Sequence, residues 1–230
     1  YFVMLQRVSY FALALPKAME FFKSLCEELE YDRSKLWLEY SNQPIKTYYP
    51  IGVLYDTLKT DDLLPWTIYI RVKGAPENSG NMSNEQLERM FMQSIKEADY
   101  LRRKAELVNG MSSEEHKQLW KGVASGSFDD FWNVNKKLVE MSDTSKINSL
   151  PIRLYKRDSP MRYAPIAVKN EDEKLNTIAD AIIIIDSSVD VKKFVFKSHG
   201  IELPLNTPLS FLAQNVAYPD NFVHIVAVAK

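Results

Sequence analysis

The sequence is poor in the residues on which most enzymes and metal proteins depend. It has one cysteine, three histidines and seven glycines among 230 residues. A single cysteine excludes a disulfide within the chain and a zinc site built on several thiolates. Neither a glycine-rich phosphate loop nor a G-x-S-x-G turn is present. His116, His199 and His224 show no metal-ligand spacing, so we expect no metal, no cofactor and no catalytic role.

An excess of charge and a long apolar run are also lacking. Lys and Arg total 29 and Asp and Glu total 30, which gives no reason to expect nucleic-acid binding. The longest apolar run, AIIII at residues 181–185, is far shorter than the ~18 residues of a membrane span. The single cysteine and the absence of a secretory signal favour a cytoplasmic location, although the sequence begins inside an apolar run.

Residues 1–74 predict a small β-rich unit. YFVMLQRVSYFALAL, residues 1–15, is rich in aromatic and β-branched residues and indicates a strand. Pro16 suits a helix start, and Cys26 then lies on the apolar face as a small buried residue. LWLEY (36–40) predicts a strand, YYPIGVLYDTL (48–58) a helix begun by proline, and LPWTIYIRVK (64–73) an alternating strand.

Residues 150–230 repeat this order of elements. PIRLYK and YAPIAVK predict a strand pair around a turn, followed by a helical stripe that contains Leu175, Ile178 and Ile182. FVFKSHG, TPLSFLAQNV and NFVHIVAV then predict a strand, a short helix begun by proline, and a final strand. The spacing repeats too, because Phe194 lies 14 residues before Pro208 and Leu36 lies 14 before Pro50.

Strand–strand–helix–strand–short helix–strand is the order of the ubiquitin-like β-grasp fold. We therefore predict an α+β protein with two ubiquitin-like β-grasp domains, residues 1–74 and 150–230, which flank a helix-rich domain. The alternative is a pair of unrelated α+β domains whose elements agree in order by coincidence.

Residues 82–142 predict the helix-rich domain. Ser83 with Gln86, and Ser112 with Glu115, have the spacing of capping boxes that begin helices. Gly110 and Gly126 are placed to end helices. The first helix has one apolar face, and the last is expected to bury Phe128, Phe131, Trp132 and Leu138. Residues 75–83 and 142–149 are polar and are the candidate linkers.

Two kinds of surface residue merit attention. Tyr48 and Tyr49 stand beside Pro50, and Tyr218 lies in YPDN, where aromatic loop residues either line a partner groove or pack on the core. Lys96 lies about 100° from the buried stripe of its helix, and its local charges balance. From these residues alone, Lys96 is typical of a solvated helix lysine.

Motifs spread over nearly the whole sequence resemble the autophagy protein 5 family. They occur in family order: RVSY (7–10), YPIGVLYD (49–56), LPW (64–66), KEAD (96–99), HKQLWKG (116–122), FDDFW with NKKL, and TPLSFLAQNVAYPDNFVHI (207–225). Such a set is far more specific than any single motif. The family architecture, two ubiquitin-like domains around a helix-rich domain, agrees with the pattern of elements.

The resemblance implies a scaffold in autophagosome formation that has no catalytic nucleophile of its own. The lysine before Glu-Ala-Asp, here Lys96, is implied to form an isopeptide bond with the ubiquitin-like modifier autophagy protein 12. The implied second partner is autophagy protein 16, whose helix would occupy a groove that includes Tyr48, Tyr49 and Tyr218. The conjugate would promote transfer of autophagy protein 8 from its conjugating enzyme to phosphatidylethanolamine, with peripheral contact at the preautophagosomal membrane.

Some expectations depart from this scheme. A helix and a strand that precede the Tyr1 segment in the family are missing here, which would leave an open sheet edge if the segment is truly absent. An unconjugated adaptor of ubiquitin-like and helical lobes, similar in outline to FERM proteins, is the alternative function. An enzyme with Cys26 as its nucleophile is the third, and slow alkylation of Cys26 would leave it without support.

Overall fold

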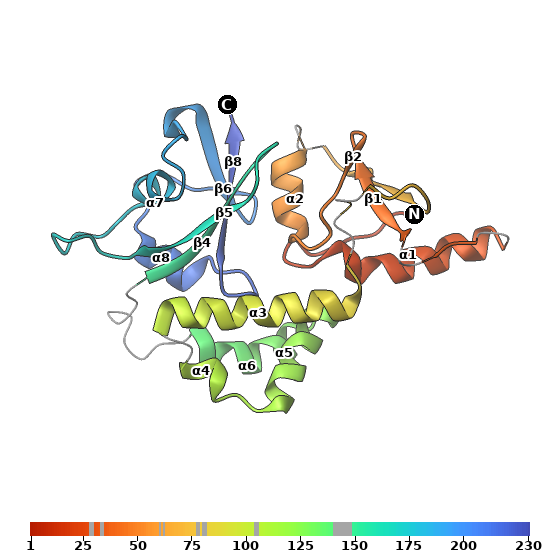
Figure 1. Ribbon diagram of the computed structural model, residues 1–230, viewed down its shortest axis with the longest axis horizontal. Coiled ribbons are helices and arrows are strands. Elements are labelled where there is room, and N and C mark those ends of the chain that lie inside the picture. The colour runs from red at the N-terminus through yellow and green to blue at the C-terminus, as the bar shows by residue number, and fades with distance from the viewer. Residues whose placement is uncertain are drawn as a thin grey trace. The chain divides into compact units, whose positions relative to one another are not determined.

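A computed structural model describes residues 1–27, 30–32, 35–59, 61, 63–76, 79, 82–103, 106–139 and 149–230. The chain folds into two compact units, residues 1–89 and 90–230. The first unit contains helices α1 (Phe11–Leu25) and α2 (Ile51–Leu58) and strands β1 (Trp37–Tyr40), β2 (Gln43–Pro44) and β3 (Tyr69–Arg71), shown in Figure 1. Its three strands form an antiparallel sheet in the order β2-β1-β3.

The strand predicted for residues 1–15 is wrong, because helix α1 begins at Phe11. Pro16 lies inside this helix and does not start it. Aromatic content favoured a strand, but Ala12, Ala14 and Ala18 are strong helix formers, and the buried residues recur at helical spacing. Phe11 and Leu15 pack in a core with Leu38, Ile45, Ile51 and Leu54.

Arg7 links the segment before α1 to helix α2 by an ion pair and hydrogen bonds. Its Nη2 lies 2.5 Å from Asp56 Oδ2 and donates a 3.2 Å hydrogen bond to the Gly52 carbonyl. In return the Gly52 amide donates to the Arg7 carbonyl at 2.7 Å. A side chain at Gly52 would place Cβ 2.9 Å from Arg7 Cβ, so this close approach needs glycine. The motifs RVSY and YPIGVLYD are therefore two sides of one contact.

Four helices connect the two sheets: α3 (Asn84–Arg103), α4 (Glu106–Asn109), α5 (Ser113–Ser125) and α6 (Phe128–Val139). Both predicted capping boxes are confirmed. Gln86 N donates to Ser83 Oγ at 3.2 Å while Ser83 N donates to Gln86 Oε1 at 2.8 Å. Ser112 and Glu115 exchange the same pair of bonds. Gly126 ends α5 in the left-handed region with φ 72°, as its position predicted.

The buried face of α6 differs from the prediction. Phe128 is 67% exposed, and Phe131 and Trp132 are half-buried. Only Leu138 of the predicted set is buried, together with Val134 and Asn135. Phe128 is the first residue of the helix, and its ring stacks on Trp132 at 5.8 Å between centroids. An aromatic pair near the helix start thus covers part of the surface without entering the core.

Gly122 of α5 lies against the backbone of Phe131 in α6. A Cβ at this position would lie 2.4 Å from Phe131 N and 2.7 Å from Phe131 Cα, which are backbone atoms that cannot rotate away. We expect Gly122→Ala to lower the free energy of unfolding by about 1–3 kcal/mol, despite the better helix propensity of alanine. Urea unfolding followed by circular dichroism measures this. Ala124→Gly on the exposed face is the control, with a loss of about 1 kcal/mol from propensity alone.

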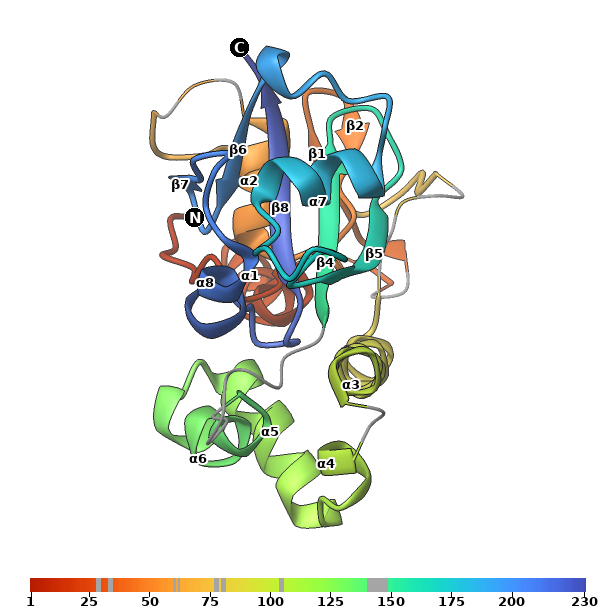
Figure 2. The same cartoon turned by 90° about the vertical axis from the view of Figure 1, so that its left-hand side faces the viewer.

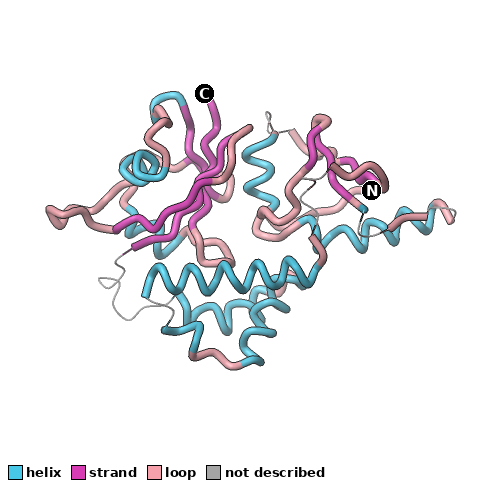
Figure 3. The backbone as a smooth tube through the Cα atoms, in the orientation of Figure 1, coloured by secondary structure: helices cyan, strands magenta, loops and turns pink. Residues whose placement is uncertain are grey.

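The second unit contains a complete β-grasp. Its elements are β4 (Ser149–Lys156), β5 (Arg162–Ala167), α7 (Ile178–Ile185), the 3₁₀ turn η3 (Val191–Lys193), β6 (Phe194–Ser198), β7 (Ile201–Glu202), α8 (Leu209–Asn215) and β8 (Val223–Ala229). The five strands run in the order β5-β4-β8-β6-β7. The first and last, β4 and β8, are parallel neighbours at the centre, and the other pairs are antiparallel. In Figure 3 these strands form one continuous magenta sheet.

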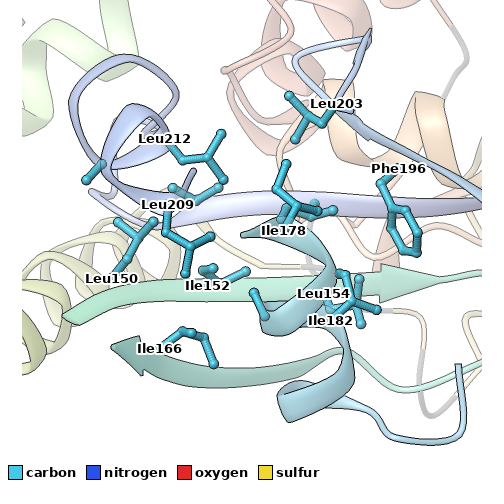
Figure 4. Packing of buried hydrophobic residues seen from close by; sticks show 14 of the residues in the cluster. Leu150, Ile152, Leu154, Ile166, Ile178, Ile182, Phe196, Leu203, Leu209 and Leu212 are labelled. Atoms are coloured by element: carbon cyan, nitrogen blue, oxygen red, sulfur yellow. The ribbon is translucent and has the colours of Figure 1, made fainter. Parts of the chain in front are cut away.

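Helix α7 crosses one face of this sheet, as Figure 2 shows. A capping box of Thr177 and Asp180 begins the helix, and its Ile178, Ala181 and Ile182 are fully buried. In Figure 4 the side chains of α7 and the central strands point toward one another. Leu175, predicted on this stripe, lies before the helix and is 49% exposed, because the capping residue Thr177 starts α7 later than the apolar pattern does.

The internal repeat is visible in the details of both units. Pro50 and Pro208 are the N-cap residues of α2 and α8, each with ψ 141°. Each sheet also has a two-residue hairpin with left-handed backbone, at Ser41–Asn42 and at His199–Gly200. The short strands β2 and β7 that these hairpins create were not predicted. Residues 142–148 of one candidate linker lie outside the described residues, and Ser149 already belongs to β4.

Candidate functional site

Helix α3 has one buried face and one exposed face. Leu87, Phe91, Ile95 and Ala98 are 0% exposed, as their spacing predicted. Lys96 lies on the other face and is exposed, beside Gln93 and one turn before Tyr100, which is 63% exposed. Within the described part of the chain, no carboxylate forms an ion pair with Lys96. Lys96 is therefore an exposed helical lysine.

The other residues of the KEAD motif have structural contacts. Ala98 is fully buried. Asp99 Oδ2 accepts from the amides of Leu107 and Val108, at 3.1 and 2.9 Å, and so satisfies the free amides at the start of α4. Glu97 Oε2 lies 4.0 Å from Arg153 Nη2. Glu97, Ala98 and Asp99 thus contact other parts of the fold, and Lys96 is the exposed residue of the motif.

Arg153 of β4 links α3 to the loop before β8. Its Nη2 donates to Ser94 Oγ at 3.0 Å, and its Nη1 donates to Asp220 Oδ2 at 2.7 Å. The guanidinium carbon lies 3.7 Å from the centre of the Phe222 ring. This cation therefore has an ion pair, a hydroxyl and an aromatic face as partners, which is the arrangement that a largely buried guanidinium requires.

His224 completes the network as a satisfied core histidine. Its Nε2 lies 3.0 Å from Asp220 Oδ1, and its Nδ1 lies 2.9 Å from the Tyr155 hydroxyl. Burial alone would raise the pKa of Asp220, but the His224 and Arg153 charges and its hydrogen bonds outweigh burial and lower that pKa overall. Asp220 is thus held as a carboxylate at the centre of a network that reaches α3.

The other histidine and cysteine side chains that the structure describes lie outside this network of hydrogen bonds. Among the residues that the structure describes, no group of three or more His, Cys, Asp or Glu could hold a metal. His199 Nε2 lies 3.2 Å from the Val216 carbonyl. Cys26 is exposed, so the expectation that it is buried is wrong: α1 ends at Leu25, and Cys26 is its C-cap residue. Because Cys26 is exposed, fast alkylation no longer distinguishes a catalytic cysteine from an ordinary one.

The three tyrosines predicted for a partner groove lie in different surroundings. Tyr48 and Tyr49 are half-buried, and their ring centroids lie 4.7 Å apart. Tyr49 packs against the apolar core of the first unit, which contains Phe11 and Leu15. Tyr218 is 2% exposed, stacks on His199 at 4.0 Å between ring centroids, and accepts a hydrogen bond from the His199 amide. Tyr48 and Tyr49 belong to the first compact unit and Tyr218 to the second, and their shared groove stays a prediction.

Sequence reasoning missed Arg153 and Asp220. A signal for each was present, since Arg153 interrupts the apolar strand IRLY, and Asp220 precedes a histidine in a strand by four residues. A charge within a buried strand calls for a charged partner.

Among the described helices, none combines the length and the apolar content that a bilayer span requires.

Comparison with known proteins agrees with this architecture. Three family models match in order: "Autophagy protein ATG5, UblA domain" at residues 1–72, "Autophagy protein ATG5, alpha-helical bundle region" at 84–141, and "Autophagy protein ATG5, UblB domain" at 149–227. The crystal structure of Kluyveromyces marxianus Atg5 has the same fold, with a TM-score of 0.80 at 22% identity over 98% of this chain and 86% of that one.

Related sequences extend over nearly the whole chain. Autophagy-related protein 5 of Caenorhabditis elegans is 37% identical over 239 residues, which cover 98% of this chain and 86% of that protein. Autophagy protein 5 of Drosophila melanogaster is 32% identical and covers 98% of this chain and 85% of its own length. The predicted α+β fold of two ubiquitin-like domains around a helical bundle is confirmed, and the chain belongs to the autophagy protein 5 family.

Proposed function

We propose that this chain is a non-catalytic autophagy scaffold whose Lys96 receives the C-terminal glycine of the ubiquitin-like modifier autophagy protein 12. Membership in the autophagy protein 5 family implies a role in autophagy. The proposal that Lys96 is the acceptor depends on one observation, the different surroundings of the four residues of KEAD. Lys96 is exposed on a helix, while the three residues after it are occupied in shaping that helix and its surroundings.

The chemistry requires little from the scaffold itself. The neutral Lys96 amine attacks the thioester carbonyl of the modifier on its conjugating enzyme; a C–N bond forms, and the C–S bond breaks. The sulfur leaves as a thiolate with the electron pair, and the nitrogen loses a proton to water or to a base of the enzyme. An exposed amine and a docking surface for the loaded enzyme are sufficient. The scaffold therefore needs neither a nucleophilic cysteine nor a metal.

The partners follow from the same proposal. The conjugate binds a helix of autophagy protein 16 in a groove to which Tyr48, Tyr49 and Tyr218 contribute. It then promotes transfer of autophagy protein 8 from its conjugating enzyme to phosphatidylethanolamine. The chain acts in the cytoplasm and contacts the preautophagosomal membrane peripherally. We propose residues 1–74, 82–142 and 150–230 as its three domains.

Mass spectrometry of a reconstituted reaction tests this function. The chain is incubated with modifier, activating enzyme, conjugating enzyme and ATP, digested with trypsin, and searched for branched peptides. We expect one branch, at Lys96, and none when ATP is omitted. A branch at another lysine rejects the site and keeps the function. No branch, while an established scaffold is conjugated in parallel, rejects the proposal in favour of an unconjugated adaptor.

A further inference from the structure

Helix α3 is tied to the second β-grasp by polar contacts on both sides of Lys96. Before Lys96, Ser94 accepts from Arg153 at 3.0 Å, and directly after Lys96, Glu97 lies 4.0 Å from the same guanidinium. Further along the helix, Arg102 donates to the Asn221 carbonyl at 2.8 Å, and Ser149 Oγ donates to the Leu101 carbonyl at 2.6 Å. Lys96 thus lies on a stretch of helix that is fixed at both ends.

These contacts specify orientation better than apolar packing does. Phe91, Ile95 and Ala98 hold the helix through dispersion contacts, which are individually weak and not directional. A guanidinium fork requires both of its acceptors at fixed angles. A buried ion pair is also seldom more stabilising than apolar residues of equal volume. The Arg153–Asp220 pair therefore needs an explanation other than stability.

We propose that Arg153 is a positioning residue for conjugation at Lys96. By joining Ser94 of α3 to Asp220 of the second β-grasp, it fixes the rotation of the helix and hence the direction of the Lys96 amine. The conjugating enzyme must bring the thioester carbonyl within attack distance of that amine, and an error of about 1 Å can cost 10²-fold in rate. This inference rests on the proposed function, since it presumes that Lys96 is the acceptor.

Single-turnover conjugation measures the effect. The conjugating enzyme is loaded with modifier in advance, the scaffold is in excess, and the rate is followed against scaffold concentration. We expect Ser94→Ala and Arg153→Lys each to lower the maximal rate about tenfold, with the half-saturating concentration unchanged within about twofold. Ser94→Ala removes the acceptor on α3, and Arg153→Lys keeps the charge but loses the fork.

The two variants also form an internal check. Because both break the same contact, the double variant should be no slower than Arg153→Lys alone. Ser125→Ala, which removes an exposed helix hydroxyl bonded to Lys121 O at 2.8 Å, should conjugate at the rate of the unmodified chain. Val123 lies in the buried face of α5, away from the Arg153 contacts. Val123→Ala is therefore the control for a general loss of stability, and each variant is assayed at the same number of degrees below its own melting temperature.

Three results would overturn the positioning role. They are an unchanged maximal rate in Ser94→Ala and Arg153→Lys, an equal loss in Val123→Ala at the same number of degrees below its own melting temperature, and a change confined to the half-saturating concentration. Failure of the proposed function is a different outcome. It occurs when the unmodified chain forms no branch at Lys96, before any variant is compared.

Discussion

Lys96→Arg is expected to abolish the covalent conjugate and to leave the fold intact. Arginine keeps the positive charge and the high helix propensity of lysine, and Lys96 is exposed with no ion pair among the described residues. Its guanidinium remains protonated at neutral pH and forms no isopeptide bond under these conditions. Gel electrophoresis under denaturing conditions should show no shifted band, and circular dichroism should show the same spectrum and melting temperature.

Lys117→Arg is the matched control for this experiment. Lys117 is also an exposed helical lysine, and it lies on α5. The Lys117→Arg variant should be conjugated at the rate of the unmodified chain. A shifted band that persists in Lys96→Arg would assign the modification to another lysine. Loss of the band in both variants would point to a general effect on docking rather than to one acceptor.

Much of the fold could be predicted because local signals agreed with the tertiary structure. The capping boxes at Ser83 and Ser112, the glycine stop at Gly126 and the proline starts of α2 and α8 each depend on a few neighbouring residues. The order of strands in residues 150–230 followed from alternation and turn residues. Such signals can be recognised in a single sequence because each involves residues only a few positions apart.

The errors arose where aromatic residues were given more weight than the other features of a segment. Residues 1–15 have the aromatic content of a strand, yet α1 begins at Phe11, and its apolar side packs on the core of the first unit. Phe128 looked like a core residue, but it is the first residue of α6 and remains exposed. For α1, the alanines and the helical spacing were local signals that the aromatic content outweighed. For Phe128, exposure depends on which surfaces the rest of the chain provides, and a short window of sequence does not show them.

The candidate site was predictable only in part. Lys96 was placed on the exposed flank of an amphipathic helix by periodicity, and the resemblance to a family singled it out. The network of Arg153 and Asp220 beside that helix was not predicted. The two residues are 67 positions apart and meet through the pairing of β4 with β8. A pair of charges at that distance in sequence becomes one contact only after the sheet has formed.

The second large effect is expected at Asp220, the centre of the buried network. Asp220→Asn keeps the size of the side chain but removes the negative charge that faces Arg153 and His224. The Asp220 side chain is 3% exposed and that of Arg153 is 15% exposed, so water cannot replace the lost partner. We expect the free energy of unfolding of residues 90–230 to fall by about 3–5 kcal/mol, the usual cost of breaking a buried pair. The melting temperature should fall by roughly 6–20 °C.

Glu173→Gln is the control, because Glu173 forms an exposed pair with Lys169 at 2.7 Å and the substitution should change stability by less than about 1 kcal/mol.

The pH dependence of stability adds an independent test. The pKa of Asp220 is lowered in the folded state, so its contribution is fully present above the unfolded pKa of ~4 and is lost as pH falls through the folded pKa. The stability difference between the unmodified chain and Asp220→Asn should therefore shrink below about pH 4. A difference that grows on acidification, or an Asp220→Asn variant as stable as Glu173→Gln, would show that the carboxylate is not what holds this network together.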